Sequence, residues 1–391
     1  MAKRIAILGS TGSIGCNALE VIAHLGEDYR AVALSARNQT DKLIEQVRRH
    51  KPIAVALAGD ADRDDRVARE IEQLGALAYH GANGLVEIVQ REEIDQVLAA
   101  IVGAAGLPAV FAAVQAGKAI ALANKESLVI AGSLLIPEAR KRKVPILPVD
   151  SEHSAIIQAM QSGKRDQIKR VLLTASGGPF RDATPEQIAR ATPQDALNHP
   201  TWRMGAKVTI DSATMFNKGL ELIEACWLFD LTPSKVEVVV HPESIIHSMV
   251  EFVDGSTIAQ LSPPDMRTPI QYALTYPERR EGCGKRMDWS RNVTLRFEPP
   301  DPRKFPALAV AYEVAEKGGT AGAVMNAANE VAVEAFMAGK IPFGGICEVV
   351  QLTIRRHTLQ THPTMDDLME ADRWARVTAN SVLVESAAKA S

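Results

Sequence analysis

The sequence predicts an α/β chain that opens with a doubly wound parallel sheet and closes with a bundle of helices. Short, mostly apolar runs recur in the first third of the chain, at residues 5–8, 31–34, 53–57, 96–102 and 119–123. Helical patterns separate these runs, and such alternation is typical of a parallel sheet. A glycine-rich turn follows the first run directly. Helical patterns fill the last part of the chain, at residues 308–316, 321–337, 347–356 and 365–388, and all but the third are rich in alanine, which allows close helix packing.

Length and composition fit a soluble protein of two or three domains. The chain has 391 residues, of which 46% are hydrophobic and 23% charged, as is usual for globular proteins. The net charge of −3 argues against a partner bound through bulk positive charge, such as nucleic acid. The four cysteines lie far apart, so we expect free thiols in a reducing cytoplasm. The sequence shows no long apolar span and no signal peptide, so we expect a cytoplasmic protein without a membrane partner.

The glycine-rich turn has the sequence GSTGSIG and occupies residues 9–15. It joins the first predicted strand to a helical pattern, which is the arrangement that binds the pyrophosphate of a dinucleotide at a helix N-terminus. The spacing is G-x-x-G-x-x-G rather than the usual G-x-G-x-x-G. An ordinary strand-to-helix turn is the alternative. The position directly after the first strand favours cofactor binding and a Rossmann-like domain.

The second predicted strand ends in the sequence SARN, residues 35–38. Enzymes that use NAD usually carry Asp or Glu here to bind the ribose 2′-hydroxyl. This chain carries Arg37 instead, and a guanidinium suits a 2′-phosphate. We therefore expect NADPH rather than NADH. The alternative for Arg37 is a solvated cation of the loop.

Two acidic residues follow another predicted strand, which comprises residues 144–149. Asp150 and Glu152 come directly after it, with Ser151 between them. Side chains two apart on an extended chain point the same way, so both carboxylates would face one small volume. Such anions repel each other unless a cation joins them, and hard divalent cations prefer oxygen ligands. A solvated acidic loop is the alternative, because a bare D-x-E pattern is common.

A third polar group follows the strand predicted at residues 119–123. Asn124, Lys125 and Glu126 stand at its carboxyl end, where ligands of doubly wound sheets bind. Lys125 would bind an anionic substrate or pair with Glu126, and its position favours the substrate.

The central region adds a loop and a candidate lid. A strand predicted at residues 171–174 enters the sequence ASGGPF, whose glycines would let backbone amides and the Ser176 hydroxyl approach an anion. Thr184 is the predicted N-cap of a helix at residues 185–190. The sequence NHPTWRMG at residues 198–205 predicts either a mobile lid that excludes water or a packed corner.

The segment DSATMFNKGLE, residues 211–221, follows a strand predicted at residues 207–210. On a helix Asn217 and Glu221 share a face, with Lys218 beside them. Ser212, Asn217 and Lys218 would form a phosphate pocket, and Glu221 would be a third carboxylate for the metal. The alternative is a Lys218–Glu221 pair on a solvated helix. His241 and His247 are predicted to be buried core residues rather than metal ligands.

Six motifs together resemble those of one family, the 1-deoxy-D-xylulose 5-phosphate reductoisomerases. They are GSTGSIG, LANKESLV, VDSEHSA, ASGGPF, DSATMFNKGLE and HPESIIHSMVEF, in collinear order along essentially the whole chain. The resemblance implies an NADPH domain at residues 1–149, an α+β catalytic domain at 150–275, a linker at 276–305 and a helical domain at 306–391. It also implies a homodimer and the conversion of 1-deoxy-D-xylulose 5-phosphate, by rearrangement and NADPH reduction, to 2-C-methyl-D-erythritol 4-phosphate.

The resemblance also implies roles for individual residues. Asp150, Glu152 and Glu221 would bind a divalent metal (Mg²⁺, Mn²⁺ or Co²⁺), and these three with Lys125 would form the catalytic set. The substrate, a phosphorylated ketose, would contact Lys125, Ser151, Glu152, Ser176, His199, Trp202, Ser212, Asn217, Lys218 and Glu221. NADPH would contact Thr11, Gly12, Ser13, Ile14, Ala36, Arg37, Asn38, Asn124, Glu126 and Gly205.

The chain departs from the family pattern in the loop after the second strand, where many members have a glycine.

Two other interpretations of the whole chain remain open. One is a metal-assisted dehydrogenase of a phosphorylated hydroxy-aldehyde that catalyses no rearrangement. The other is a non-catalytic protein that senses NADPH.

Overall fold

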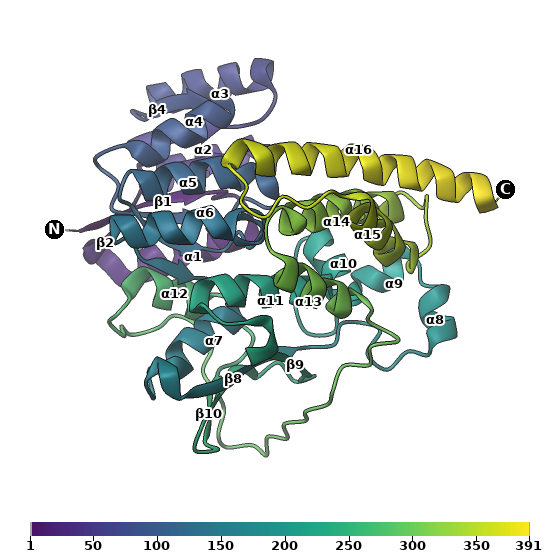
Figure 1. The fold of residues 1–391 in the computed structure, drawn as a ribbon. Coiled ribbons are helices and arrows are strands. Elements are labelled where there is room, and N and C mark those ends of the chain that lie inside the picture. The colour runs from purple at the N-terminus through teal and green to yellow at the C-terminus, as the bar shows by residue number, and fades with distance from the viewer. Residues whose placement is uncertain (1, 391) are drawn as a thin grey trace. The chain divides into compact units, whose positions relative to one another are not determined.

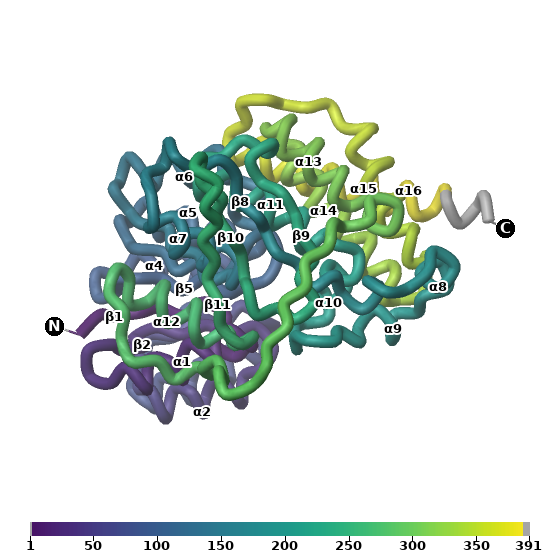
Figure 2. The backbone as a smooth tube through the Cα atoms, turned by 90° about the horizontal axis from the view of Figure 1, so that it is seen from below, coloured from purple at the N-terminus to yellow at the C-terminus, as the bar shows by residue number. Residues whose placement is uncertain are grey.

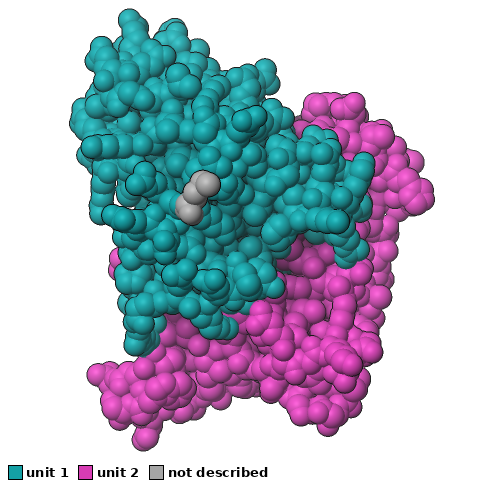
Figure 3. Space-filling view, turned by 90° about the vertical axis from the view of Figure 1, so that its left-hand side faces the viewer, with its two compact units in different colours: residues 1–127, 135–154, 265–286 teal, residues 128–134, 155–264, 287–391 magenta. Residues whose placement is uncertain are grey.

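The computed structural model describes the backbone of residues 2–390 and the side chains of residues 2–385. Its residues form two compact units, coloured separately in Figure 3. Unit 1 comprises Met1–Ser127, Leu135–Ser154 and Asp265–Arg286, and unit 2 comprises Leu128–Leu134, Ala155–Pro264 and Met287–Ser391. The four-part division expected from the sequence stays a prediction.

Unit 1 is built on a seven-stranded sheet in the order β4-β3-β2-β1-β5-β6-β7, in which every neighbouring pair is parallel. Figure 1 labels β1, β2 and β4 of this sheet. Its strands are β1 (Lys3–Leu8), β2 (Tyr29–Ala36), β3 (Ala54–Leu57), β4 (Leu77–His80), β5 (Gln96–Ala99), β6 (Ala119–Leu122) and β7 (Ile146–Pro148). The central strands are almost fully buried, which is why they are continuous apolar runs rather than alternating ones. The predicted doubly wound sheet is confirmed.

Helices connect these strands. They are α1 (Ser13–Leu25), α2 (Thr40–His50), α3 (Ala61–Gln73), α4 (Gly81–Gln90), α5 (Leu107–Gln115) and α6 (Glu126–Arg142), which has non-helical backbone angles at Ala131. A seventh helix, α12 (Arg267–Thr275), packs against α1 although it follows much later in the sequence. The Lys3 ammonium donates to the Leu274 carbonyl at 2.7 Å and so ties α12 to β1.

Unit 2 contains a mixed four-stranded sheet in the order β11-β10-β8-β9. Its strands are β8 (Ile168–Ala175), β9 (Val236–Val240), β10 (Ile246–Phe252) and β11 (Thr257–Leu261). β8 pairs in parallel with β9, whereas β10 runs antiparallel to both β8 and β11. With its helices α10 (Ala206–Thr214) and α11 (Phe216–Phe229), this sheet confirms the predicted α+β character of the central region.

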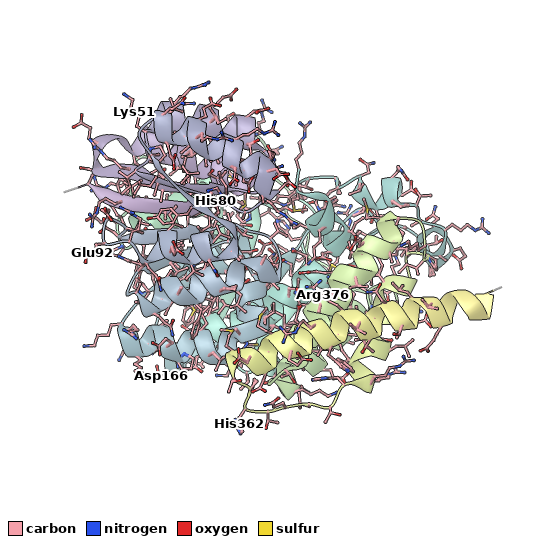
Figure 4. All side chains as sticks on the ribbon, turned by 90° about the horizontal axis from the view of Figure 1, so that it is seen from above. Lys51, His80, Glu92, Asp166, His362 and Arg376 are labelled. Atoms are coloured by element: carbon pink, nitrogen blue, oxygen red, sulfur yellow. The ribbon has the colours of Figure 1, made fainter. Side chains whose placement is uncertain are left out.

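The remainder of unit 2 is a helical bundle whose predicted helices are confirmed. It comprises α13 (Ala307–Lys317), α14 (Ala321–Met337), α15 (Gly345–Arg356) and α16 (Met365–Ala390). The Arg376 guanidinium on α16, labelled in Figure 4, donates to Glu330 on α14 at 2.7 Å. The Asn329 amide donates to the buried Asp211 carboxylate at 2.8 Å and joins α14 to α10. Before α13 the chain runs through residues 276–305 without a helix, visible as a long green trace in Figure 2.

Two local predictions were wrong. The strand predicted at residues 207–210 lies inside α10, because a run of four residues is too short to distinguish a strand from a buried helical turn. The extended geometry predicted for Asp150, Ser151 and Glu152 was also wrong. Ser151 begins helix α7 (Ser151–Met160), so that only Asp150 still belongs to the chain leaving β7. No helix in the described residues is long and apolar enough to span a membrane.

Candidate active site

The glycine-rich turn between β1 and α1 leaves no room for side chains at two positions. Gly9 has a φ of +82°, and a Cβ there would stand 2.8 Å from the Ala100 carbonyl oxygen. A Cβ on Gly15 would overlap the Gly9 carbonyl oxygen. These two glycines therefore let the turn close tightly against the ends of the central strands.

The N-terminus of α1 is open to an anion. Its N-cap residue, Gly12, supplies no side-chain hydrogen bond, and no acidic residue lies in the first turn. Gly12 and Ser13 are exposed, Ile14 is half-buried and Thr11 is buried. The amides of a first turn lack partners within the helix and carry the positive end of its dipole. These four residues, which are among those predicted to bind the cofactor, therefore lie at a site that suits a pyrophosphate.

Three side chains that the sequence analysis did not select hold this turn. Ser35 accepts a hydrogen bond from the Gly9 amide at 2.9 Å. Gln46 on α2 donates to the Ser10 carbonyl at 2.9 Å and accepts from the Ser10 hydroxyl at 2.7 Å. Lys42 donates to the Thr11 carbonyl at 2.9 Å. The sequence offered one signal for Gln46, namely a polar residue on the apolar face of the predicted helix, and that face is buried in α2.

The loop that follows β2 carries the predicted 2′-phosphate residues. β2 continues through Ala36, whose carbonyl accepts from the Ala58 amide at 3.0 Å. Arg37 and Asn38 lie beyond this bond and are exposed. Within the described residues the Arg37 side chain makes no hydrogen bond or ion pair, so its guanidinium is available to a ligand.

Asn124 and Glu126, predicted to lie near the nicotinamide, are buried in a hydrogen-bonded cluster after β6. The Asn124 amide nitrogen is within bonding distance of the Ile101 and Gly103 carbonyls, at 2.6 and 3.0 Å, and of Glu126, at 2.8 Å. Its amide oxygen accepts from the Ser127 amide at 3.1 Å. These bonds fix the backbone at the carboxyl end of β6 and so the direction in which Lys125 leaves it.

Lys125 and Asp150 form an ion pair at the carboxyl ends of the adjacent strands β6 and β7. Their side-chain atoms Nζ and Oδ2 are 3.1 Å apart, and the two side chains are 12% and 13% exposed. Asp150 also accepts from the Glu152 amide at 3.1 Å, and the Ser151 hydroxyl donates to the Glu152 carboxylate at 2.6 Å. The start of α7 thus holds both predicted carboxylates close together. They lie at a helix N-terminus, where the helix dipole favours negative charge.

A second cluster, in unit 2, follows β8. The Ser176 hydroxyl oxygen lies 3.0 Å from His199 Nε2 and accepts from the Gly178 amide at 3.2 Å. Gly178 has a φ of +64°, and a Cβ there would stand 2.7 Å from the Ser212 carbonyl oxygen. The loop that carries Ser176 therefore lies against the backbone of Ser212, whereas the phosphate pocket itself stays a prediction.

His199 organises the candidate lid. Its Nδ1 accepts from the Thr201 and Trp202 amides at 3.1 and 2.9 Å, so the neutral ring carries its proton on Nε2 and donates it to Ser176. Ser176 then keeps its own hydroxyl proton for another acceptor. Burial lowers the pKa of His199, which favours this neutral form. The Trp202 ring centre lies 6.2 Å from that of His247, so the segment packs locally in an irregular conformation.

The third group lies on α11, which begins after Met215 with a φ of +67°. The Asn217 amide donates to Glu221 at 2.5 Å, and the Lys218 ammonium donates to the other oxygen of the same carboxylate. Lys218 and Glu221 have side chains only 4% and 1% exposed. The predicted Lys218–Glu221 pair therefore exists, but it is buried rather than on a solvated helix face.

The remaining predicted residues fall in separate places. Gly205 is the exposed N-cap of α10 in unit 2. Asp150 and Glu152 belong to unit 1 and Glu221 to unit 2, so their joint ligation of one metal stays a prediction. His241 and His247 are buried and hydrogen-bonded to Arg296 and Ser262 respectively, as predicted for core residues.

Comparison with known proteins decides the family. Three family models match the chain: "1-deoxy-D-xylulose 5-phosphate reductoisomerase" at residues 5–132, its C-terminal domain at 146–229, and "DXP reductoisomerase C-terminal domain" at 261–378. The 1-deoxy-D-xylulose 5-phosphate reductoisomerase of Phocaeicola vulgatus is 49% identical over 383 residues, which cover 98% of this chain and 100% of the relative. That of Bacteroides fragilis is 50% identical over 381 residues, covering 97% and 98%. The chain belongs to the 1-deoxy-D-xylulose 5-phosphate reductoisomerase family.

Solved structures of reductoisomerases have the same fold. The enzyme from Zymomonas mobilis in complex with NADPH is 42% identical, with a TM-score of 0.91 over 98% of this chain and 99% of that one. A DOX-P reductoisomerase in complex with NADPH, fosmidomycin and magnesium is 41% identical, with a TM-score of 0.91 over 97% and 98%. The resemblance stated from the motifs is confirmed.

The hydrogen bonds to His199 Nδ1 should depend on pH. Burial lowers the pKa of His199 in the folded protein. The two hydrogen bonds are therefore present at any pH above the ordinary histidine pKa of about 6.5, and they are lost as the pH falls through the lowered pKa. We expect the hydrogen-exchange protection of the Thr201 and Trp202 amides to fall about fivefold over this range, the equivalent of one net bond of ~1 kcal/mol. The Gln187 amide, which donates to the Thr184 hydroxyl, is the control and should keep its protection. Protection of Thr201 and Trp202 that does not change with pH would contradict this role.

Proposed function

We propose that the protein is a 1-deoxy-D-xylulose 5-phosphate reductoisomerase. It would rearrange 1-deoxy-D-xylulose 5-phosphate and reduce the product with NADPH to 2-C-methyl-D-erythritol 4-phosphate, in the non-mevalonate route to isoprenoids. The observation that carries the proposal is the match to curated reductoisomerases at 49% and 50% identity over almost the entire chain. The hydrogen-bonded groups around Asp150, Ser176 and Glu221 support it.

The proposed metal ligands are Asp150, Glu152 and Glu221. Carboxylate oxygens are the donors that Mg²⁺ and Mn²⁺ prefer, and a related solved structure contains magnesium. Asp150 and Glu221 are each paired with a lysine, whose positive charge favours the carboxylate form that metal ligation requires. The donor set therefore fits Mg²⁺, Mn²⁺ or Co²⁺.

The proposed cofactor is NADPH, which two related solved structures contain. Its pyrophosphate would lie on the amides of Thr11, Gly12, Ser13 and Ile14 at the uncapped start of α1. Its 2′-phosphate would lie beside Ala36, Arg37 and Asn38. Asn124, Glu126 and Gly205 would border the nicotinamide half.

The substrate phosphate would bind to Ser176, His199, Ser212, Asn217 and Lys218. Ser176 supports this because it accepts from His199 and Gly178, which directs its own hydroxyl proton away from them. Lys218 and Asn217 already donate to Glu221, so one carboxylate would link the phosphate donors to the metal. Trp202 would cover the substrate and exclude water.

The chemistry follows from these contacts. When bound, the metal polarises the substrate carbonyl and lowers the pKa of a neighbouring hydroxyl, and NADPH supplies the hydride. Lys125 would contact the ketose while holding Asp150 in place, and Ser151 would contact it from the first turn of α7. Holding the ketose in one orientation lowers the barrier to an intramolecular rearrangement. The resemblance, rather than the geometry, identifies that rearrangement.

We also propose that the protein acts as a cytoplasmic homodimer. β11 stands at an edge of its sheet, and an edge strand offers unpaired backbone groups to a second copy. The four cysteines are free, which suits a reducing compartment.

The reaction is tested with purified protein, 1-deoxy-D-xylulose 5-phosphate, NADPH and Mg²⁺ or Mn²⁺. We expect NADPH oxidation with a turnover number on the order of 10 s⁻¹, one branched product per NADPH, and no activity after chelation of the metal. NADPH absorbance and mass and NMR spectra of the product provide the measurement. An unbranched product would favour a plain dehydrogenase, and no oxidation would favour a non-catalytic sensor.

Replacing the buried lysine tests the phosphate pocket. Lys218→Ala removes a charge-assisted hydrogen bond, so we expect KM for the ketose phosphate to rise roughly tenfold or more, with KM for NADPH unchanged. Steady-state kinetics at saturating metal measure both constants. Lys235→Ala removes an exposed cation from the same unit and should leave them unchanged. An unaltered KM for the ketose phosphate in Lys218→Ala would remove Lys218 from the pocket.

A further inference from the structure

A second arginine lies against the loop that carries Arg37. β2 and β3 are parallel neighbours, so the chain leaving β3 returns to the same edge of the sheet as the loop after β2. Arg63 stands in the first turn of α3, which follows β3. Its Nη2 donates to the carbonyl oxygen of Arg37. The two arginines are therefore adjacent in space although 26 positions apart in sequence.

Neighbouring groups fix Arg63 in this position. The buried Asp64 carboxylate accepts from Arg63 Nη2 at 3.2 Å and, through its other oxygen, from the Gly59 amide at 2.7 Å. Asp60 accepts from the Arg63 amide at 3.1 Å and caps α3. A Cβ on Gly59 would overlap both the Arg63 guanidinium and the Arg37 carbonyl oxygen. Asp60 and Asp64 thus position the arginine, and Gly59 leaves the space that it occupies. The neighbouring Asp62 and Asp65 are exposed.

The two guanidinium groups still have unused donors. Arg63 binds its protein partners through Nε and Nη2, and in the described residues its Nη1 makes no hydrogen bond. Arg37 makes none with its side chain there. Arg63 remains 29% exposed, so a ligand can reach it. Two guanidinium groups with free N–H groups, one of them held rigidly, form a site for a dianion such as a phosphate monoester.

We propose that Arg63 is a second, positioned cation for the 2′-phosphate of the cofactor and so determines the preference for NADPH over NADH. The adenosine ribose of a dinucleotide lies at the carboxyl end of β2, where this pair of arginines stands. In the chain that follows β2, no acidic residue precedes Asp41 to bind a free 2′-hydroxyl. The inference rests on the proposed use of NADPH.

The test compares two probes that differ only in the 2′-phosphate, namely 2′,5′-ADP and 5′-ADP. Calorimetric titration of the whole protein should show that Arg63→Ala binds 2′,5′-ADP about tenfold more weakly, a difference of about 1.4 kcal/mol. It should bind 5′-ADP as the wild type does. Arg63→Lys keeps the charge but not the planar fork, so we expect an intermediate loss. In kinetics, KM for NADPH should rise by a similar factor, with KM for NADH unchanged.

Arg66→Ala is the matched control, because Arg66 is an exposed cation on the same helix without a partner among the described residues. It should leave both affinities unchanged. If Arg63→Ala and Arg63→Lys bind 2′,5′-ADP like the wild type, or lose affinity for both probes equally, the role assigned to Arg63 is wrong. If the wild type itself does not prefer 2′,5′-ADP, the NADPH assignment fails and this inference fails with it.

Discussion

The candidate active site depends on two lysine–carboxylate ion pairs that are largely shielded from water. Lys125 pairs with Asp150 in unit 1 and Lys218 with Glu221 in unit 2, with no side chain in either pair more than 13% exposed. A carboxylate with so little water around it needs a counter-charge, and in each pair the lysine supplies one. Under the proposed function a divalent cation supplies further compensation.

Much of the fold was predictable, because its signals are local. Buried parallel strands need continuous apolar runs, and Gly9 marks the place where the first strand must turn. Pairing over long distances left no such signal. Nothing in the sequence of α12 indicates that it packs against α1 or that Leu274 at its end accepts a hydrogen bond from Lys3 of β1, 271 positions away. The strand wrongly predicted at residues 207–210 shows that local signals can fail as well. Four residues are too few for hydrophobic periodicity to distinguish a strand from a helix.

The positions of site residues were predictable where polar side chains directly follow a predicted strand. Lys125 and Asp150 could each be placed at the carboxyl end of a strand, where ligands of such sheets bind, but the ion pair between them was not predicted. The conformation of Ser151 and Glu152 was not predictable, because a helix begins there without a break in the polar pattern. Gln46, Asp64 and Arg63 were missed for a different reason. Each acts on a turn or loop reached only through the fold, and each alone resembles an ordinary helix residue.

Binding of Mn²⁺, followed by electron paramagnetic resonance with and without NADPH, will show whether Asp150, Glu152 and Glu221 share one divalent ion. We expect one tight site in the wild type that Glu152→Gln and Glu221→Gln each weaken by roughly tenfold or more, as expected when a coordinating carboxylate is lost. Glu334→Gln, which alters an exposed acid on α14, should bind Mn²⁺ normally. Wild-type Mn²⁺ affinity in Glu221→Gln would exclude Glu221 from the metal site.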